Sequence, residues 1–249
     1  LTFVTLRDET GIVQIITEDA DMFKGITRES TVTITGTVKL RTEDMINPNM
    51  KTGKIEILAS SVEVLGECAS ILPFEINRSR EEASEETRLK YRYLDLRNPK
   101  VHDNMVFRFK VIDYIRSLMK SMDFTEISTP IITTSSPEGA RDFIIPSRKY
   151  KGKFYALPQA PQIYTQLLMV SGFNKYFQIA PCFRDEDCRA DRTLEFYQLD
   201  FEMSFVTEED VYKVGEKIFY DVFSNFTDKY VSPAPFRRIP YSEAMLKYG

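Results

Sequence analysis

With 249 residues and 43% hydrophobic content, the chain is long enough for one large domain or two smaller ones. Its net charge of −4 excludes general electrostatic attraction to nucleic acid, so any RNA contact must come from local patches and stacking. Three cysteines without paired spacing argue against a disulfide framework, and no apolar run is long enough to span a membrane.

The first 65 residues have an all-β pattern. Short alternating runs are joined by turn-rich loops, which suits a small barrel of the OB type. The pattern alone equally allows a three- or four-stranded sheet. The runs lie near residues 2–6, 12–17, 31–40 and 54–64. Residues 66–100 then form a connector, and its charge-mixed stretch at 80–88 is expected to be partly helical.

A long helix is expected between residues 101 and 124, because apolar residues recur there at helical spacing. Residues 124–132 become strand-like up to Pro130. The expected packing face of the helix consists of Met105, Phe109, Ile112, Ile115, Met119 and Met122.

A second helix is expected to start at Thr207, because Asp210 follows three residues later as in a capping box. Its expected buried face consists of Val211, Val214, Ile218 and Val222. Strands mixed with packing helices, without repeated βαβ units, predict an α+β core around an antiparallel sheet.

A highly charged loop at 184–194 separates two strand-like runs, and this arrangement predicts a hairpin. One face would carry Arg184, Phe196, Gln198 and Asp200. The other face would pack through Phe177, Ile179, Phe183, Tyr197, Leu199, Phe201, Met203 and Phe205. A guanidinium, a ring and a carboxylate on one face suit a phosphorylated ligand that carries a base. An ordinary solvated hairpin would show the same pattern, so both interpretations stay open.

Four stretches carry a family resemblance. FRDED at 183–187, followed by Arg189, Arg192 and EF at 195–196, resembles motif 2 of class II aminoacyl-tRNA synthetases. The other three are KYRYLDLR at 90–97, SPEGARDF at 136–143 and ALPQAPQ at 156–162. Together they resemble the aspartyl-specific synthetases of bacteria and organelles, in order along the whole chain.

The resemblance implies an α+β protein in three parts. A partial OB-type barrel that binds the anticodon would occupy 1–65, and a hinge or connector would occupy 66–100. The N-terminal part of a class II catalytic domain, an antiparallel sheet with packing helices, would occupy 101–249. The helix and strand before Pro130 resemble motif 1, which implies a homodimer with Pro130 at its interface.

The implied reaction is ATP-dependent activation of L-aspartate to aspartyl-adenylate, followed by transfer to tRNA(Asp). Arg184 and Glu186 would be the catalytic pair. Arg184 would bridge the α-phosphate and the substrate carboxylate, because a planar fork of donors suits both oxyanions. Glu186 would contact ATP or the incoming tRNA end, and Phe196 would stack under adenine.

The resemblance also implies two sets of binding residues. The substrate's ammonium and carboxylate would be held by Glu138, Gln162, Arg184, Gln198 and Asp200. The anticodon would be read by Phe3, Gln14, Lys39 and Arg41. In such sites an aromatic ring stacks a base, an amide reads a base edge and basic groups hold phosphates.

ATP and magnesium are the implied cofactors. Motif 3 and the magnesium ligands are expected beyond Gly249, so we expect no metal site within this chain and no catalysis by this piece alone. We expect no membrane partner. The expected compartment is the cytoplasm if the source is bacterial, or the mitochondrial matrix or plastid if it is eukaryotic.

Four positions depart from the family pattern. Thr165 stands where a lysine is usual, and Ala160 replaces a serine. Thr193 with Leu194 replaces Gln-Pro, and Pro181 interrupts the strand that leads to Arg184. These departures favour the alternative of a non-catalytic, synthetase-derived tRNA-binding or scaffold protein. An asparagine- or lysine-specific synthetase is a closer rival, which the stretch at 156–162 disfavours.

Overall fold

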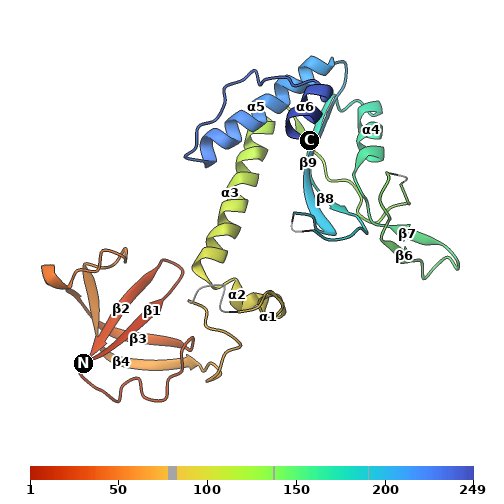
Figure 1. The fold of residues 1–249 in the computed structure, drawn as a ribbon. Helices are drawn as coiled ribbons and strands as arrows, with labels where there is room; N and C mark the ends of the chain where they lie inside the picture. Colours follow the sequence, from red (N-terminus) through yellow and green to blue (C-terminus); the bar gives the residue numbers. More distant parts are fainter. Residues whose placement is uncertain (78–82, 137, 190) are drawn as a thin grey trace. The chain divides into compact units, whose positions relative to one another are not determined.

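The protein forms two compact units, Leu1–Asn98 and Pro99–Gly249. Most of the predicted connector therefore belongs to the first unit. The structure is a computed structural model, and it describes residues 1–77, 83–136, 138–189 and 191–249 (Figure 1). Predictions that fall on residues 78–82, 137 and 190 lie outside the described residues.

The N-terminal unit is built on a four-stranded sheet with the order β1-β2-β4-β3 (Figure 1). Its strands are β1 (Thr2–Arg7), β2 (Ile12–Thr17), β3 (Thr31–Leu40) and β4 (Ile55–Gly66), and η1 (Glu43–Met45) follows β3. The strands agree with the four predicted runs. β2 and β4 are parallel, while the other neighbours are antiparallel. Among the described strands, β1 and β3 are outermost, so the sheet is open.

A β-bulge at Ser60 of β4 interrupts the regular pairing of β3 with β4. The β3–β4 register shifts between Thr35 and Gly36. A Cβ atom on Gly36 would lie 2.4 Å from the Leu58 carbonyl oxygen, so only glycine allows the two backbones to approach this closely. Ile15, Ile16 and Ala59 are buried in this unit, with Ile15 and Ile16 on opposite faces of β2.

The connector is fixed to the N-terminal sheet by charge pairs. It contains two short helices, α1 (Glu85–Lys90) and α2 (Arg92–Asp95). The half-buried Glu29 carboxylate pairs with Arg7 of β1 at 2.7 Å and with Arg97, just after α2, at 3.0 Å. The helical segment is therefore part of the first unit. The mixed charges at 80–88 predicted part of a helix there, and α1 covers residues 85–90.

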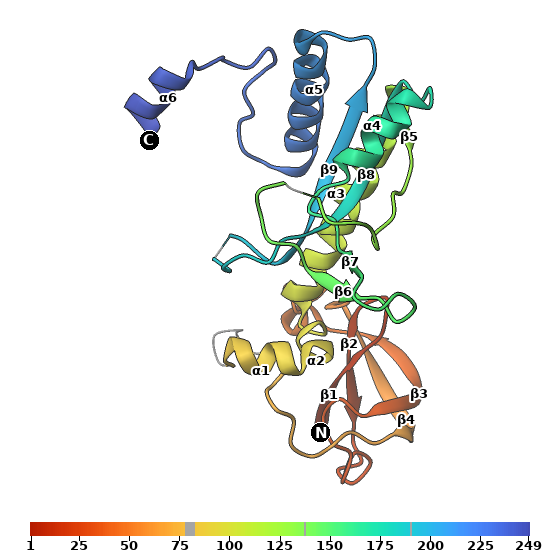
Figure 2. The ribbon, with the colours of Figure 1, turned by 90° about the vertical axis from the view of Figure 1, so that its right-hand side faces the viewer.

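The C-terminal unit places a three-stranded sheet between helices (Figures 1 and 2). The sheet has the order β5-β8-β9, and β6 and β7 form a separate two-stranded sheet. α3 and α5 lie on one side of the larger sheet and α4 lies on the other. The elements are α3 (Pro99–Ser121), β5 (Thr125–Glu126), β6 (Ile144–Pro146), β7 (Phe154–Ala156), α4 (Gln162–Val170), β8 (Lys175–Phe183), β9 (Glu195–Met203), α5 (Glu208–Phe226) and α6 (Tyr241–Tyr248).

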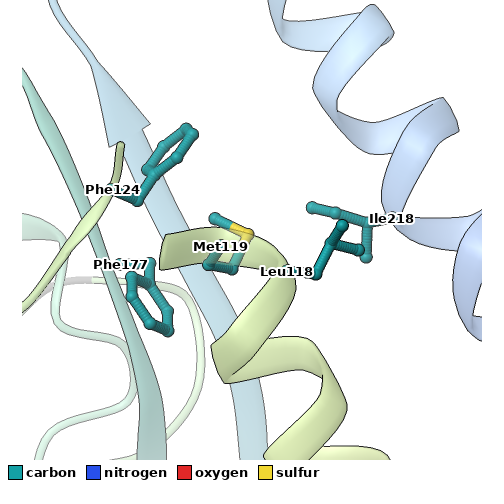
Figure 3. Packing of buried hydrophobic residues seen from close by; sticks show 5 residues of the cluster. All are labelled: Leu118, Met119, Phe124, Phe177 and Ile218. Atoms are coloured by element: carbon teal, nitrogen blue, oxygen red, sulfur yellow. The ribbon is translucent and has the colours of Figure 1, made fainter. Parts of the chain in front are cut away.

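The core of this unit lies where the C-terminal end of α3 meets the sheet and α5. Figure 3 shows Met119 and Leu118 of α3 between the rings of Phe124 and Phe177 and the side chain of Ile218. The odd-numbered residues of β8 and β9 face this core, as Phe177, Leu199 and Phe201 do. The even-numbered residues therefore point to the opposite face.

The predicted antiparallel sheet is wrong in one respect, because β5 runs parallel to β8 and is only two residues long. The strand predicted up to Pro130 stops at Glu126 for a visible reason. The Gln178 amide accepts a hydrogen bond from the Thr129 N–H at 3.1 Å and donates to the Thr129 hydroxyl at 2.8 Å. A side chain thus replaces the ladder partner after Ile127.

Five residues that were predicted to be packed are exposed, and one of them is Tyr197 of β9, which is 53% exposed. Met105 and Phe109 lie on the N-terminal part of α3, beyond its contact with the sheet. Val211 lies near the start of α5, where Thr207 and Asp210 form the predicted capping box. Phe205 is 99% exposed, since β9 ends at Met203 and Phe205 takes a positive φ of 58° that breaks the alternation. No described helix combines the length and apolarity needed to cross a membrane.

Candidate active site and candidate RNA-binding face

The register of the predicted hairpin gathers the candidate residues on one face. In the β8–β9 ladder, Gln178 lies opposite Asp200, Ala180 opposite Gln198, and Cys182 opposite Phe196. Residues directly opposite in an antiparallel pair share a face. Gln198, Asp200 and Phe196 therefore line one surface, and Arg184 follows β8 in the same register.

Arg184 has free hydrogen-bonding capacity beside an aromatic ring. Its guanidinium carbon lies 5.1 Å from the centre of the Phe196 ring. Its backbone N–H donates to the Leu194 carbonyl at 2.9 Å, which fixes the base of the charged loop. Among the described residues its buried Nε has no hydrogen-bond partner. An anionic ligand would satisfy this donor, and a planar base would fit the neighbouring ring.

The other end of the face is acidic. Burial raises the pKa of Asp200 above its usual value, and the Glu202 and Glu138 carboxylates raise it further, although the Tyr176 hydroxyl opposes them. Asp200 Oδ2, Glu202 Oε2 and the Tyr176 hydroxyl are buried without partners among the described residues. Two carboxylate oxygens with unmet hydrogen bonds, and the nearby negative charge of Glu138, favour a cationic group such as an ammonium. No group of three described His, Cys, Asp or Glu side chains is placed to hold a metal ion.

Between these two ends, Cys182 orients Gln198. Burial raises the pKa of the Cys182 thiol to about 11, with Arg184 opposing and Asp200 and Glu138 adding to the effect. The thiol therefore stays protonated at neutral pH, and Sγ lies 3.2 Å from the Gln198 carbonyl oxygen as a donor. A buried, protonated thiol is a weak nucleophile, so its role here is to hold the amide.

The remaining predicted residues are distributed around this face. Glu138 accepts a hydrogen bond from the Ser136 hydroxyl at 3.1 Å and acts electrostatically on Asp200. Gln162 is exposed at the first residue of α4, and Glu186 is exposed in the charged loop. The structure thus brings Glu138 to the face but does not join the side chains of Gln162 and Glu186 to it. Pro130 is exposed beyond β5.

Two of the departures from the family pattern have a structural account. Thr165 is 1% exposed, and its hydroxyl donates to the Gln162 carbonyl within α4 at 3.0 Å. Thr165 is thus occupied in its own helix and brings no charge to the carboxylates. Thr193 donates to the Glu195 carbonyl, which closes the loop before β9. Ala160 is half-buried, and no contact explains its substitution.

Pro181 is compatible with its strand. The Phe183 N–H donates to the Pro158 carbonyl, and the Phe177 carbonyl accepts from Ile127, so both groups point away from β9. The backbone direction alternates with period two, which places the missing N–H of Pro181 on the same side. That side faces β5, which pairs only with Tyr176 and Phe177 and does not reach Pro181. The missing N–H of Pro181 therefore removes no hydrogen bond between β8 and β9.

The N-terminal unit carries a second candidate site on its sheet. Lys39 lies opposite Glu56 in the ladder, and Gln14 donates to the Glu56 carboxylate at 3.3 Å. Arg41 Nε lies 3.5 Å from the same carboxylate. Phe3 pairs with Ile16, two residues from Gln14, so its ring shares this face and is 64% exposed. The four predicted residues therefore surround or adjoin Glu56.

Three residues at these sites were missed by the sequence analysis. Tyr176 and Glu202 lie opposite one another in the register of Asp200, so the alternation that singled out Asp200 also carried their signal. Glu56 stands between two isoleucines and has the same period-two signal. Nothing in the sequence indicated that Glu56 meets Gln14, because 42 residues separate them.

Comparisons with known proteins cover both units. The family described as tRNA synthetases class II (D, K and N) matches residues 84–249, and the OB-fold nucleic acid binding domain matches residues 1–65. Aspartate–tRNA(Asp/Asn) ligases of Rickettsia akari and Rickettsia prowazekii are 57% and 56% identical over 100% of this chain. The chain spans 42% of the length of each.

A solved structure agrees with the fold. The asparaginyl-tRNA synthetase of Pyrococcus horikoshii, complexed with asparaginyl-adenylate, matches with a TM-score of 0.78 and 28% identity. The match covers 98% of this chain and 58% of that chain. Together with the family matches, it confirms the α+β class and the OB-type fold that the sequence predicted.

Proposed function

Because the chain belongs to the class II tRNA synthetases of the D, K and N group, we propose that the protein carrying it is an aspartate–tRNA ligase. It activates L-aspartate with ATP, giving aspartyl-adenylate and pyrophosphate, and transfers the aspartyl group to tRNA(Asp). The names of the rickettsial relatives support aspartate as the amino acid. The observation that carries the proposal is the single face that joins Arg184 and Phe196 to Asp200, whose buried Oδ2 has no partner among the described residues.

The chemistry of activation suits this face. The substrate carboxylate attacks the α-phosphorus of ATP, and negative charge accumulates on the phosphate oxygens as pyrophosphate leaves. Arg184 binds both oxyanions through its guanidinium, whose Nε is unpartnered among the described residues, and Phe196 stacks on the adenine beside it. Asp200, Glu138 and Gln198 hold the ammonium end of aspartate, where the unmet carboxylates favour a cation.

Further residues complete the proposal. Gln162 binds the amino acid from the start of α4, and Glu186 binds ATP or the tRNA end from the charged loop. The described residues include no set suited to a magnesium ion, so no step through magnesium is assigned to this chain.

Exposed Met105, Phe109 and Pro130 support a homodimer that covers α3 and the segment after β5.

The N-terminal face binds the anticodon of the tRNA in this proposal. The exposed ring of Phe3 stacks on a base, and Gln14 reads a base edge while Glu56 orients its amide. Lys39 and Arg41 hold phosphates. The bacterial relatives support the bacterial cytoplasm as the compartment.

The test is aspartate-dependent ATP–pyrophosphate exchange by the native polypeptide that carries this chain. We expect exchange with aspartate and at least tenfold less with asparagine or lysine, followed by charging of tRNA(Asp). Exchange driven by asparagine would instead favour the asparagine-specific rival. Retained tRNA binding with no exchange for any of the three amino acids would favour the non-catalytic tRNA-binding or scaffold protein.

A further inference from the structure

Gln159 is a buried amide that none of the proposed steps uses. It lies between β7 and α4 and is 1% exposed. A side-chain amide buried this deeply must be hydrogen-bonded, because an unpaired amide costs roughly 1–3 kcal/mol in a protein. Its partners therefore show which part of the protein it organises.

All of those partners belong to one loop. Gln159 Oε1 accepts from the Ala140 N–H at 3.1 Å, and Nε2 donates to the Ala140 carbonyl at 2.9 Å. Nε2 also lies 3.3 Å from the Ser136 carbonyl and contacts the Asp142 carboxylate. One side chain thus serves both backbone groups of Ala140, as a strand partner would.

The loop carries Glu138, which faces the acidic end of the site. The Glu138 N–H donates to the Ser136 carbonyl at 2.9 Å, so Gln159 and Glu138 share this acceptor. The Ser136 hydroxyl holds the Glu138 carboxylate at 3.1 Å. The position of Glu138 therefore depends on backbone atoms that Gln159 fixes.

The loop is also joined to the base of the charged loop after β8. Arg141 Nε donates to the Asp185 carbonyl at 3.2 Å, and the Asp185 N–H donates to the Arg141 carbonyl at 3.0 Å. Asp185 directly follows Arg184. The Phe183 N–H donates to the carbonyl of Pro158, the neighbour of Gln159, at 2.9 Å. These bonds form a closed circuit from Gln159 through both loops and back.

We propose that Gln159 is a positioning residue, which sets the distance between Glu138 and Arg184 without touching either. The inference rests on the proposed function. In that function, Glu138 binds the positive end of aspartate and Arg184 binds its carboxylate and the α-phosphate. A misplacement of about 1 Å between two such groups typically costs on the order of 100-fold in rate.

The circuit also keeps Asp142 ionised. Partial burial opposes ionisation of Asp142, but hydrogen bonds from Ser135, Gln159 and the Ser136 backbone outweigh it, so its pKa lies below the usual value. An acceptor in place of the Gln159 N–H donors would therefore face an ionised carboxylate and two carbonyl oxygens. This makes Gln159→Glu a sharp test, since it preserves shape, removes the donors and adds a negative charge beside Asp142.

In the native protein we expect Gln159→Glu to lower kcat/KM for aspartate in ATP–pyrophosphate exchange about tenfold or more. Asp142→Asn in the same background is expected to restore part of the loss, because an amide donates to the new carboxylate. Gln166→Glu is the matched control, since Gln166 is exposed on α4. A value for Gln159→Glu within twofold of wild type overturns the proposal.

Amide hydrogen exchange separates this proposal from the proposed function, because it needs no activity. Gln159→Glu is expected to speed exchange about tenfold in both 138–142 and 184–186, with α5 unchanged. Faster exchange in 138–142 alone would overturn the proposal, because the second loop would then be independent of Gln159. If Gln159→Glu fails to fold, Arg141→Ala removes the side-chain bond from the exposed Arg141 to the Asp185 carbonyl and leaves the backbone bond between the two residues. Unchanged amide hydrogen exchange in 184–186 of this variant would overturn the proposal. If the wild type shows no aspartate-dependent ATP–pyrophosphate exchange, that result would contradict only the proposed function.

Discussion

The contact between Arg184 and Phe196 shows how a residue type is chosen by geometry. A guanidinium stacks on a ring through its plane and still directs its N–H groups outward, which an ammonium cannot do. Across the same hairpin, Arg108 of α3 stacks on Tyr197 at 4.9 Å on the opposite face. The two arginines have similar ring contacts but different surroundings, and they provide a matched pair.

We expect Arg184→Lys to reduce kcat/KM for aspartate-dependent exchange about 10–100-fold, because a charge-assisted hydrogen bond contributes about 1.5–3 kcal/mol. Arg108→Lys, which also alters an arginine stacked on an aromatic ring of β9, is expected to stay within about threefold of wild type. Steady-state kinetics of pyrophosphate exchange measures both. Equal losses in the two variants would contradict the role of Arg184 in binding oxyanions.

We expect the substitution Asp200→Asn to raise stability and to lower activity. Its folded-state pKa is raised, so its ionised form opposes folding at neutral pH. Asp200→Asn is expected to raise the unfolding midpoint at pH 7. The gain should shrink as the pH falls through the raised pKa and vanish below the ordinary aspartate value of about 4. The same variant should lower the rate of aspartate-dependent ATP–pyrophosphate exchange about 10-fold or more.

Thermal scans between pH 3 and 8 test the stability part of this prediction. Glu195→Gln is a suitable control, because Glu195 is exposed at the start of β9. A midpoint for Asp200→Asn below that of wild type at pH 7 would mean that Asp200 has a favourable partner in the folded state.

At the scale of elements, the start of α5 has a complete local explanation. The Thr207 side chain caps the helix, and the Asp210 carboxylate accepts from the Thr207 N–H at 3.1 Å and its hydroxyl at 2.8 Å. These bonds, with Lys213, lower the pKa of Asp210 to about 2. The capping box depends on residues three apart, so the sequence was sufficient to predict it.

Thr207→Ala is expected to lower the free energy of unfolding by about 1 kcal/mol, because the first turn loses its cap. Ser224→Ala, at an exposed position within α5, is the control and should cause no loss. Since the folded pKa of Asp210 is depressed, its contribution is present above the ordinary aspartate pKa and is lost as the pH falls toward about 2. Chemical denaturation at pH 7 and pH 3 should therefore show a smaller difference at the lower pH.

For the whole molecule, two separate units carry two separate tasks in the proposal. The candidate anticodon-binding residues belong to the first unit, and the candidate activation residues belong to the second. A change in the first unit should therefore alter dependence on tRNA and leave activation without tRNA intact. This expectation applies to the native polypeptide that carries the chain, and the chain spans 42% of the length of the Rickettsia akari relative.

Phe3→Ala is expected to raise KM for tRNA(Asp) about 10–100-fold, because one base–aromatic stack contributes about 1–3 kcal/mol. Aspartate-dependent exchange in the absence of tRNA should not change. Val38→Ala is the control, since Val38 is exposed on the opposite face of the same sheet. A loss of exchange in Phe3→Ala would mean that the two units do not act separately.

Local pattern by itself determined the strands of the first unit, the hairpin and the capped helix, because each depends on residues that are close in sequence. Period two was enough to put Arg184, Phe196, Gln198 and Asp200 on one face. The same rule failed at Phe205, where a positive φ ended the strand. The OB type and the residue roles came from the resemblance rather than from periodicity.

Only the tertiary structure decided which distant groups meet. Glu56 with Gln14, Gln178 with Thr129, and Arg141 with Asp185 are pairs separated by more than 40 residues. Tertiary structure also decided that β5 is short and runs parallel to β8, and that the Gln159 amide hydrogen-bonds to both backbone groups of Ala140. Such contacts arise because buried polar groups must be hydrogen-bonded, whichever segment of the folded chain supplies the partner. The spacing of residues in the sequence does not indicate which distant segments come together.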